Sequence, residues 1–127
     1  MDLYPPPLLY PRPPAEQLIV AVAVPIVFGV VTGLTLGWSE PVYLVLQLVG
    51  IAGGYLAGME HDAPLEGVYR GLLGGLLFGS SILIAHGLAD AAPKADLPEP
   101  ETLLIAITAG FGTLLGWLGA RRRARSG

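Results

Sequence analysis

Four long apolar segments alternate with short polar or proline-rich connections along this chain. The segments cover about residues 16–38, 41–59, 67–89 and 101–120. Each has roughly the 17–25 residues that a helix needs to cross ~30 Å of hydrocarbon at about 1.5 Å per residue. The pattern therefore predicts an all-α integral membrane protein with four transmembrane helices in residues 15–120, between a proline-rich arm (1–14) and a basic tail (121–127).

Prolines mark the starts of two predicted helices and one interior point. Pro41 and Pro100 stand at helix starts, where a missing amide proton costs little. Pro25 lies inside the first segment and predicts a kink there. Six of the twelve prolines lie in the arm, which favours an extended conformation and makes it either a flexible tail or a segment anchored along the membrane surface. The candidate anchors are Leu3, Tyr4, Leu8, Leu9 and Tyr10.

Glycines recur four residues apart in every apolar segment, although each costs a helix roughly 0.5–1 kcal/mol relative to alanine. These glycines are Gly29, Gly33 and Gly37; Gly50, Gly54 and Gly58; Gly67, Gly71, Gly75 and Gly79; and Gly112 and Gly116. In lipid, helices associate mainly through close backbone packing and polar contacts, and small residues four apart permit that approach. The spacing therefore predicts that the four helices pack along glycine ridges.

Two further glycines widen these ridges. Gly53 stands beside Gly54, and Gly74 stands beside Gly75, so the second and third helices each present bare backbone on two faces. Two such faces favour neighbours beyond the same subunit, and we expect a homo-oligomer. The alternative is tight packing within a monomer or an asymmetric dimer.

The number and distribution of charged residues indicate the class of protein and its orientation in the membrane. Only 13% of the residues are charged and 53% are hydrophobic, which is typical of a membrane protein. The net charge of −3 gives no reason to expect nucleic-acid binding, and the absence of cysteine excludes disulfides and thiolate metal sites. An even number of spans places both termini and the loop at 60–66 on one side, with six arginines against the single Lys94 on the other. The arginines are Arg12, Arg70, Arg121, Arg122, Arg123 and Arg125. This asymmetry predicts a multi-pass cell-membrane protein with both termini in the cytoplasm, its basic tail in contact with anionic membrane lipids.

Polar residues within the apolar segments are candidates for function, because such groups are costly in hydrocarbon. Gln47 and His86 both lie in the outer third of their helices and on the side that carries the glycines. With Thr108, and Thr32 or Thr35, they could form one polar layer. Such a layer is either a proton-sensitive constriction or a set of interhelical hydrogen bonds.

The loop at 60–66 and the start of the third helix hold the densest charged cluster. Its members are Glu60, His61, Asp62, Glu66 and Arg70. We expect mainly a salt-bridge network, with Glu66 and Arg70 paired at i,i+4. A metal site is the weaker alternative because the spacing matches no known ligand pattern, and a ring of these charges at the inner mouth of an oligomeric pore is another.

No nucleophilic triad, phosphate-binding loop or intramembrane acid pair is visible, so the sequence predicts neither an enzyme nor a cofactor. The loops predicted to lie outside are acidic; their acids are Glu40, Asp90, Asp96, Glu99 and Glu101. These carboxylates either solvate the loops and cap helix starts, which we favour, or raise the local cation concentration at the mouth of a pore. The sequence thus favours a small homo-oligomeric channel or passive transporter for a small ion, more readily a cation. The alternative is a non-catalytic accessory or assembly subunit of a larger membrane complex.

Overall fold

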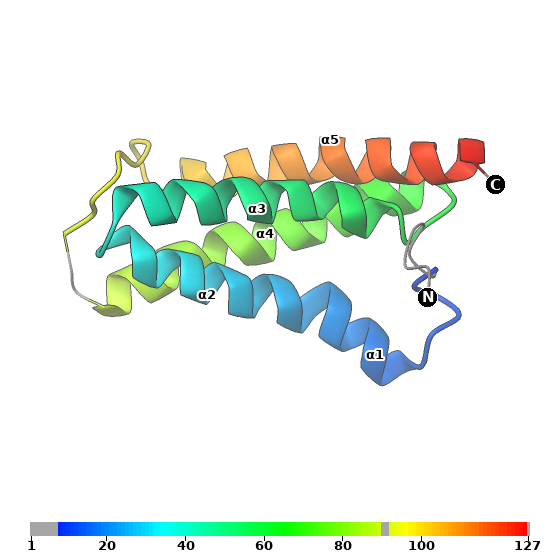
Figure 1. Ribbon diagram of the computed structural model, residues 1–127, viewed down its shortest axis with the longest axis horizontal. Coiled ribbons are helices and arrows are strands. Elements are labelled where there is room, and N and C mark those ends of the chain that lie inside the picture. The colour runs from blue at the N-terminus through cyan, green and yellow to red at the C-terminus, as the bar shows by residue number, and fades with distance from the viewer. Residues whose placement is uncertain (1–7, 90–91, 127) are drawn as a thin grey trace.

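The computed structural model of the protein describes residues 8–89 and 92–126, and its regular elements there are all helical (Figure 1). The elements are α1 (Pro14–Leu18), the π-helical turn η1 (Ile19–Ala23), α2 (Val24–Leu36), α3 (Glu40–Gly58), α4 (Pro64–Ala89) and α5 (Leu103–Ser126). Four stretches are long and apolar enough to cross a membrane: Pro14–Leu36, Glu40–Gly58, Pro64–Ala89 and Leu103–Arg125. The chain therefore has the build of a multi-pass membrane protein. The predicted anchors Leu3 and Tyr4 and the acidic Asp90 lie outside the described residues.

The first span is one helical stretch with an irregular turn. α1 runs into η1, whose closing bond joins the Val24 amide to the Ile19 carbonyl, five residues back. Pro25 stands in the first turn of α2, so it contributes no amide proton to this ladder. A π-helical turn directly before the proline is the form that the backbone irregularity takes.

Local signals in the sequence explain where the other helices begin and end. Ser39 caps α3 by accepting a hydrogen bond from the Val42 amide at 3.5 Å, and Pro41 occupies the first turn. Pro64 opens α4 in the same way. α5 continues to Ser126, six residues beyond the predicted end at Ala120. Arginine is a good helix former, and cations are favourable near a helix C-terminus, which accounts for this extension.

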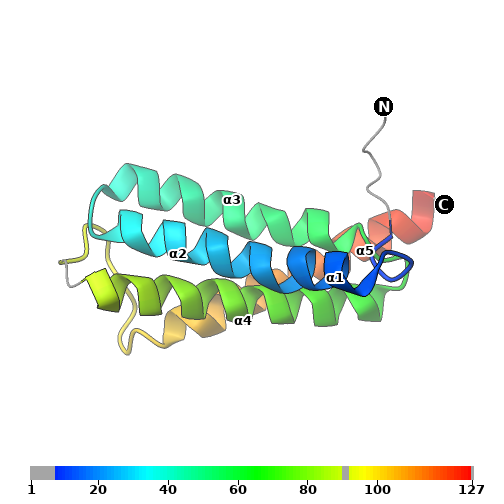
Figure 2. The same cartoon turned by 90° about the horizontal axis from the view of Figure 1, so that it is seen from below.

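The chain turns at two opposite ends of the bundle (Figures 1 and 2), and the residues at these ends differ in charge. We call the end that holds residues 8–13, the loop at 59–63 and the C-terminus the basic end. The connections at 37–39 and 92–102 lie at the other end, which we call the acidic end because it carries Glu40, Asp96, Glu99 and Glu101 with Lys94. Each helix therefore runs from one end of the bundle to the other.

The closest packing in the bundle joins α4 to α5. A Cβ atom built on Gly71 would overlap the carbonyl oxygen of Gly112, and one built on Gly67 would overlap that of Gly116. A Cβ on Gly75 would lie 2.5 Å from the Ala109 Cα. The hydroxyl of Thr108 donates to the Gly75 carbonyl at 2.7 Å, which joins the two helices by a hydrogen bond between a side chain and the backbone.

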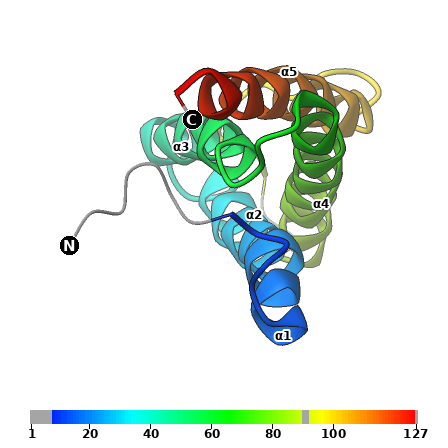
Figure 3. The ribbon, with the colours of Figure 1, turned by 90° about the vertical axis from the view of Figure 1, so that its right-hand side faces the viewer.

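The half of the bundle toward the acidic end is filled by side chains. Its core consists of Leu36, Tyr43, Phe78, Ile82, Ala95 and Leu104. Leu36 and Ile82 are fully buried, and α2 approaches α4 so closely that a Cβ on Gly33 would overlap the Ile82 carbonyl. Towards the basic end the first span turns away from α3, as Figures 1 and 3 show. There η1 packs on α4 and makes no comparable contact with α3.

Candidate functional site

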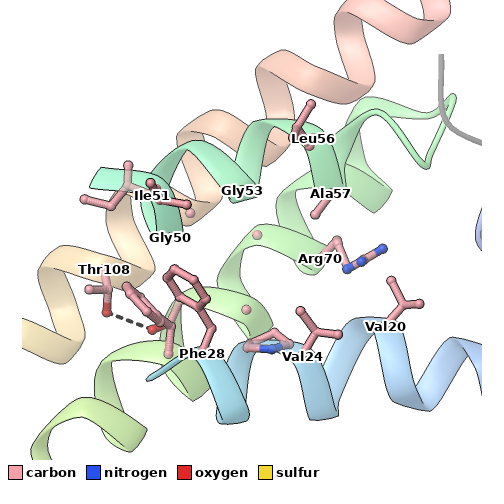
Figure 4. A pocket seen from close by; sticks show the side chains of 18 of the residues that line it. Val20, Val24, Phe28, Gly50, Ile51, Gly53, Leu56, Ala57, Arg70 and Thr108 are labelled. Atoms are coloured by element: carbon pink, nitrogen blue, oxygen red, sulfur yellow. Dashed lines mark hydrogen bonds between the residues drawn. The ribbon is translucent and has the colours of Figure 1, made fainter. Parts of the chain in front are cut away.

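A cavity of about 460 Å³ lies where the first span diverges from α3 (Figure 4). The first span contributes Val20, Val24, Pro25 and Phe28; α3 contributes Val49, Gly50, Ile51, Gly53, Gly54, Leu56 and Ala57; α4 contributes Arg70, Gly71, Gly74, Gly75 and Phe78; α5 contributes Thr108 and Gly112; and Glu60 completes the lining. Small-molecule sites in proteins commonly have volumes of about 300–1,000 Å³. The cavity is large enough to hold a ligand.

Glycines create much of this space. No heavy atom lies within 4 Å of the position that a Cβ would take on Gly53 or on Gly74, and both residues line the cavity. The neighbouring Gly75 and Gly54 also line the cavity, but a Cβ on either of them would meet α5. The paired glycines of α3 and α4 thus serve two surfaces within one chain, a packed one and an open one.

An aromatic pair closes the cavity toward the acidic end. The rings of Phe28 and Phe78 lie 5.7 Å apart, and a Cβ on Gly50 would meet the Phe78 ring. Phe78 is 5% exposed and belongs to the packed core. The cavity is therefore confined to the basic-end half and the middle of the bundle.

Charged residues form the opposite end of the cavity. Glu60 accepts a hydrogen bond from Arg12 through Oε2 at 2.8 Å, and its Oε1 lies 2.7 Å from Nη2 of Arg70. The second contact is an ion pair whose angles fall outside hydrogen-bond geometry. Arg12 also lies 3.6 Å from Oε1 of Glu16, whose side chain is half exposed, so Glu60 is the buried carboxylate that the two guanidinium groups share. Glu60 and Arg70 are the only ionised side chains among the described residues that line the cavity.

His61 extends this cluster and is 2% exposed. Its Nε2 lies 3.2 Å from Nη1 of Arg70, and because a guanidinium only donates, Nε2 must accept. The ring is then neutral, with its proton on Nδ1, which lies 3.6 Å from Oε1 of Glu66. Burial, and next the positive charge of Arg70, lower the pKa of His61 from its usual 6.5, against the opposing effect of Glu66 and Glu60.

Residues 8–13 lie across the basic end and are held there by several contacts. The Leu9 amide donates to the Glu60 carbonyl at 2.8 Å, and the Tyr10 ring meets the edge of His61 at 5.1 Å. Leu9 is 3% exposed, so the expectation that it anchors the arm in lipid is wrong; it packs inside the protein. A second hollow of about 480 Å³ lies between this segment, the first span and α4, with Arg70 also on its wall.

The other predicted polar residues do not come together. Thr108 bonds to Gly75, and Gln47, half-buried, donates to the Tyr43 hydroxyl on its own helix at 3.4 Å. His86 is buried, and its Nδ1 has no hydrogen-bond partner. Within residues 8–89 and 92–126, no hydrogen bond joins Gln47, His86 and Thr108 to one another.

The predicted inner cluster is assembled, with different partners. Arg70 pairs with Glu60, not with Glu66, so the expected i,i+4 pair is wrong; in the structure Glu66 approaches His61. Glu60 follows the end of α3 in a hydrogen-bonded turn, and its carboxylate lies against Arg70 in the second turn of α4. Asp62 is exposed, and in the described part of the chain no three histidine or carboxylate side chains are placed to hold a metal ion.

Sequence reasoning missed Arg12 as a member of the cluster. The signal was present, since Arg12 is the one charged residue among the prolines of the segment that precedes α1. No family model, curated protein or solved structure matches this chain. The functional argument therefore rests on the cavity and the charged cluster.

Proposed function

We propose that the protein is a small passive membrane transporter whose substrate occupies the cavity between the first span, α3, α4 and α5. The observation that carries this proposal is the contrast between the two halves of the bundle. One half is hollow up to the Phe28–Phe78 pair, and the other is filled by the core around Leu36 and Ile82. A path that is open on one side of a packed layer and closed on the other is what one state of an alternating-access transporter requires.

The charge asymmetry supports an orientation for this transporter. The basic end carries six arginines, and the positive-inside rule places such an end in the cytoplasm. Both termini would then face the cytoplasm of the cell, and the cavity would lie in the cytoplasmic half of the cell membrane. Labelling of a single cysteine introduced at Ser126 in intact cells, against one introduced at Lys94, tests this orientation.

The overlaps at Gly67, Gly71, Gly33 and Gly58 support glycine-ridge packing within one chain. The case for a homo-oligomer is different, because the paired glycines that motivated it have a use inside the monomer, where Gly53 and Gly74 line the cavity. A homo-oligomer stays a prediction from the sequence. Mass measurement of the purified protein in detergent tests it directly.

The substrate that the sequence favours, a small cation, also stays a prediction. The acidic end supports it through four carboxylates against Lys94 among the described residues. The cavity lining supports it less, because most of it is apolar and a bare ion would lose its hydration without new ligands. A polar layer of Gln47, His86 and Thr108 would need a rearrangement or a second subunit to form.

Reconstitution into vesicles tests transport. We expect flux of at least one member of a panel of cations, anions, protons and amphipathic acids above the rate in protein-free vesicles. Gly74→Leu fills the cavity and should abolish that flux, whereas Gly87→Leu, on the same helix but outside the lining and with no heavy atom within 4 Å, should leave it unchanged. Equal rates in all vesicles, with and without protein, would contradict the proposal.

An accessory role is the second candidate, and the exposed apolar helix faces favour it. Leu44, Val45, Leu48 and Val49 of α3 are each about half exposed or more. These side chains can face lipid or a larger membrane complex. Isolation from the native membrane with one stoichiometric partner, together with absence of flux, would support this role.

A further inference from the structure

We propose that the cavity binds an amphipathic molecule with one apolar tail and an anionic headgroup, and that Arg70 binds the headgroup. This inference rests on the proposed function, because it names the class of substrate for the same cavity. The tail would lie between α2, α3 and α4, and the carboxylate or phosphate would lie at the basic end. The molecule would reach the site from the membrane, through the opening between η1 and α3.

The opening faces the hydrocarbon. Val24 on the first span is 53% exposed and Leu56 on α3 is 55% exposed, and both line the cavity (Figure 4). The two helices diverge here, as seen from two directions in Figures 1 and 3. A molecule dissolved in the bilayer can therefore enter sideways without crossing the charged cluster.

The lining matches an acyl chain. Valine, phenylalanine and leucine side chains and the bare backbone of glycines make up most of the wall, which is therefore mainly apolar. A lipid tail gains little by moving from the bilayer into an apolar cavity, because both surroundings are equally apolar. Selectivity must therefore come from the polar end of the site.

Arg70 supplies that polar end. It is 8% exposed and is the one cation among the described lining residues. Its two terminal nitrogens contact Glu60 and His61, and no hydrogen bond from its Nε is found in residues 8–89 and 92–126. A guanidinium has five donors and binds carboxylates and phosphates in a planar fork, so Arg70 retains capacity for an anion.

The surroundings of Arg70 also favour a negative headgroup. The carboxylate of Glu60 is shared between Arg12 and Arg70, so Arg70 does not have a carboxylate to itself, and His61 beside it is neutral. Arg70 lies six residues into α4, about 9 Å along the helix from Pro64 at about 1.5 Å per residue. If the 26-residue α4 is centred on ~30 Å of hydrocarbon, Arg70 lies a few ångströms inside the boundary between headgroups and acyl chains, within reach of the head of a single-tailed lipid.

Native mass spectrometry of the purified protein with added single-tailed lipids tests this inference. Palmitate and palmitoyl lysophosphatidate supply the two anionic headgroups, and hexadecanol supplies the same tail without a charge. We expect at least one of the two anions to bind one molecule per chain, with hexadecanol about tenfold weaker or worse. The stronger of the two anions identifies carboxylate or phosphate as the natural headgroup. Equal binding of hexadecanol and both anions would overturn the role of Arg70.

Variants show where the ligand binds and distinguish a loss of binding from a loss of folding. Arg70→Gln should weaken binding of the preferred anion about tenfold and leave hexadecanol binding unchanged. Gly74→Leu leaves the charged cluster intact and should abolish binding of all three molecules, and Gly87→Leu should bind as the wild type does. Wild-type binding in Gly74→Leu would place the ligand elsewhere and overturn the inference.

The outcomes for binding and for transport are distinguishable. Saturable binding of a headgroup-bearing chain without flux in vesicles would contradict transport and leave the binding site standing. Ion flux that is insensitive to palmitate and lysophosphatidate, with no binding of either, would overturn the inference and leave transport standing.

Discussion

The α4–α5 pair and the pair formed by the first span and α3 use the same residue types to opposite effect. Glycines 67, 71 and 75 of α4 meet the backbone of α5 so closely that no Cβ fits. Gly53 of α3, like Gly74 of α4, faces the open space of the cavity. In the first pair the backbone of the partner occupies the space that a side chain leaves, and in the second pair nothing does.

The difference shows that a row of glycines on a membrane helix does not by itself set the distance to the next helix. That distance also depends on the residues that the next helix presents. α5 supplies Gly112, Gly116 and the hydroxyl of Thr108, so α4 can approach along its whole length. The first span presents Val20, Val24 and Phe28 to the cavity, and near the basic end it makes no comparable contact with α3. Four predictions test this comparison.

The largest effect is expected at the closed pair. Gly71→Ala adds a methyl group against the Gly112 carbonyl, and because both neighbours are backbone the helices must separate. We expect a loss of about 3 kcal/mol in the free energy of unfolding, as for an overpacked core. Unfolding in a detergent–dodecyl sulfate titration, followed by circular dichroism, measures it. Gly110→Ala on α5, which has open space around it, is the matched control, and an equal loss there would contradict the interpretation.

The next effect concerns the charged end of the open pair. Glu60→Gln leaves Arg12 and Arg70 without their shared carboxylate, and Glu60 is only 12% exposed at its side chain. Hydrogen bonds to charged groups contribute about 1.5–3 kcal/mol, so the same titration should show a loss of about 2 kcal/mol. Glu66→Gln, at a side chain that is 36% exposed, should cost less than about 1 kcal/mol. A larger cost at Glu66 than at Glu60 would reverse the assignment of the central carboxylate.

A smaller effect of opposite sign is expected inside the cavity. Gly74→Ala and Gly53→Ala place a methyl group in open space and raise helix propensity. Each should stabilise the fold by about 0.5–1 kcal/mol in the same measurement. A loss comparable with that of Gly71→Ala would mean that α3 and α4 close over this space in the membrane.

The smallest effect is a pH dependence. The pKa of His61 is lower in the folded protein than the usual 6.5, so the unfolded chain binds a proton more readily. Stability should therefore fall as the pH drops through 6.5 and level off below the pKa of the folded state. His61→Asn should flatten this part of the profile. An unchanged slope in that variant would show that another group titrates.

The helices were predictable from the sequence because the apolar runs are long and end at prolines or charges. The structure has four such helices, close to the expected ranges. The end of α5 was not predictable from hydropathy. The apolar pattern stops where the arginines begin, whereas the helix continues through Ser126. The form of the irregularity at Pro25 also needed coordinates, since a proline is compatible with a bend or with a π-helical turn.

The candidate site was predictable in part. The cluster of Glu60, His61 and Arg70 was recognisable as a group of charged residues next to an apolar segment. Which of these side chains contact one another depends on the conformation of the loop at 59–63, which the sequence does not reveal. The cavity was not predictable, because it arises from the angle between two helices rather than from any one segment. Arg12 joins the site for the same reason, across 48 residues of sequence.

The π-helical turn in the first span has a mechanical consequence. The Val24 amide already bonds five residues back, and Pro25 has no amide proton, so bending the backbone here breaks fewer hydrogen bonds than elsewhere in that span. The turns before this hinge carry Val20, and the attached segment carries Leu9 and Arg12. Movement of α1 about this hinge would change the width of the opening between η1 and α3. The same movement would displace Arg12 and, through it, the carboxylate of Glu60.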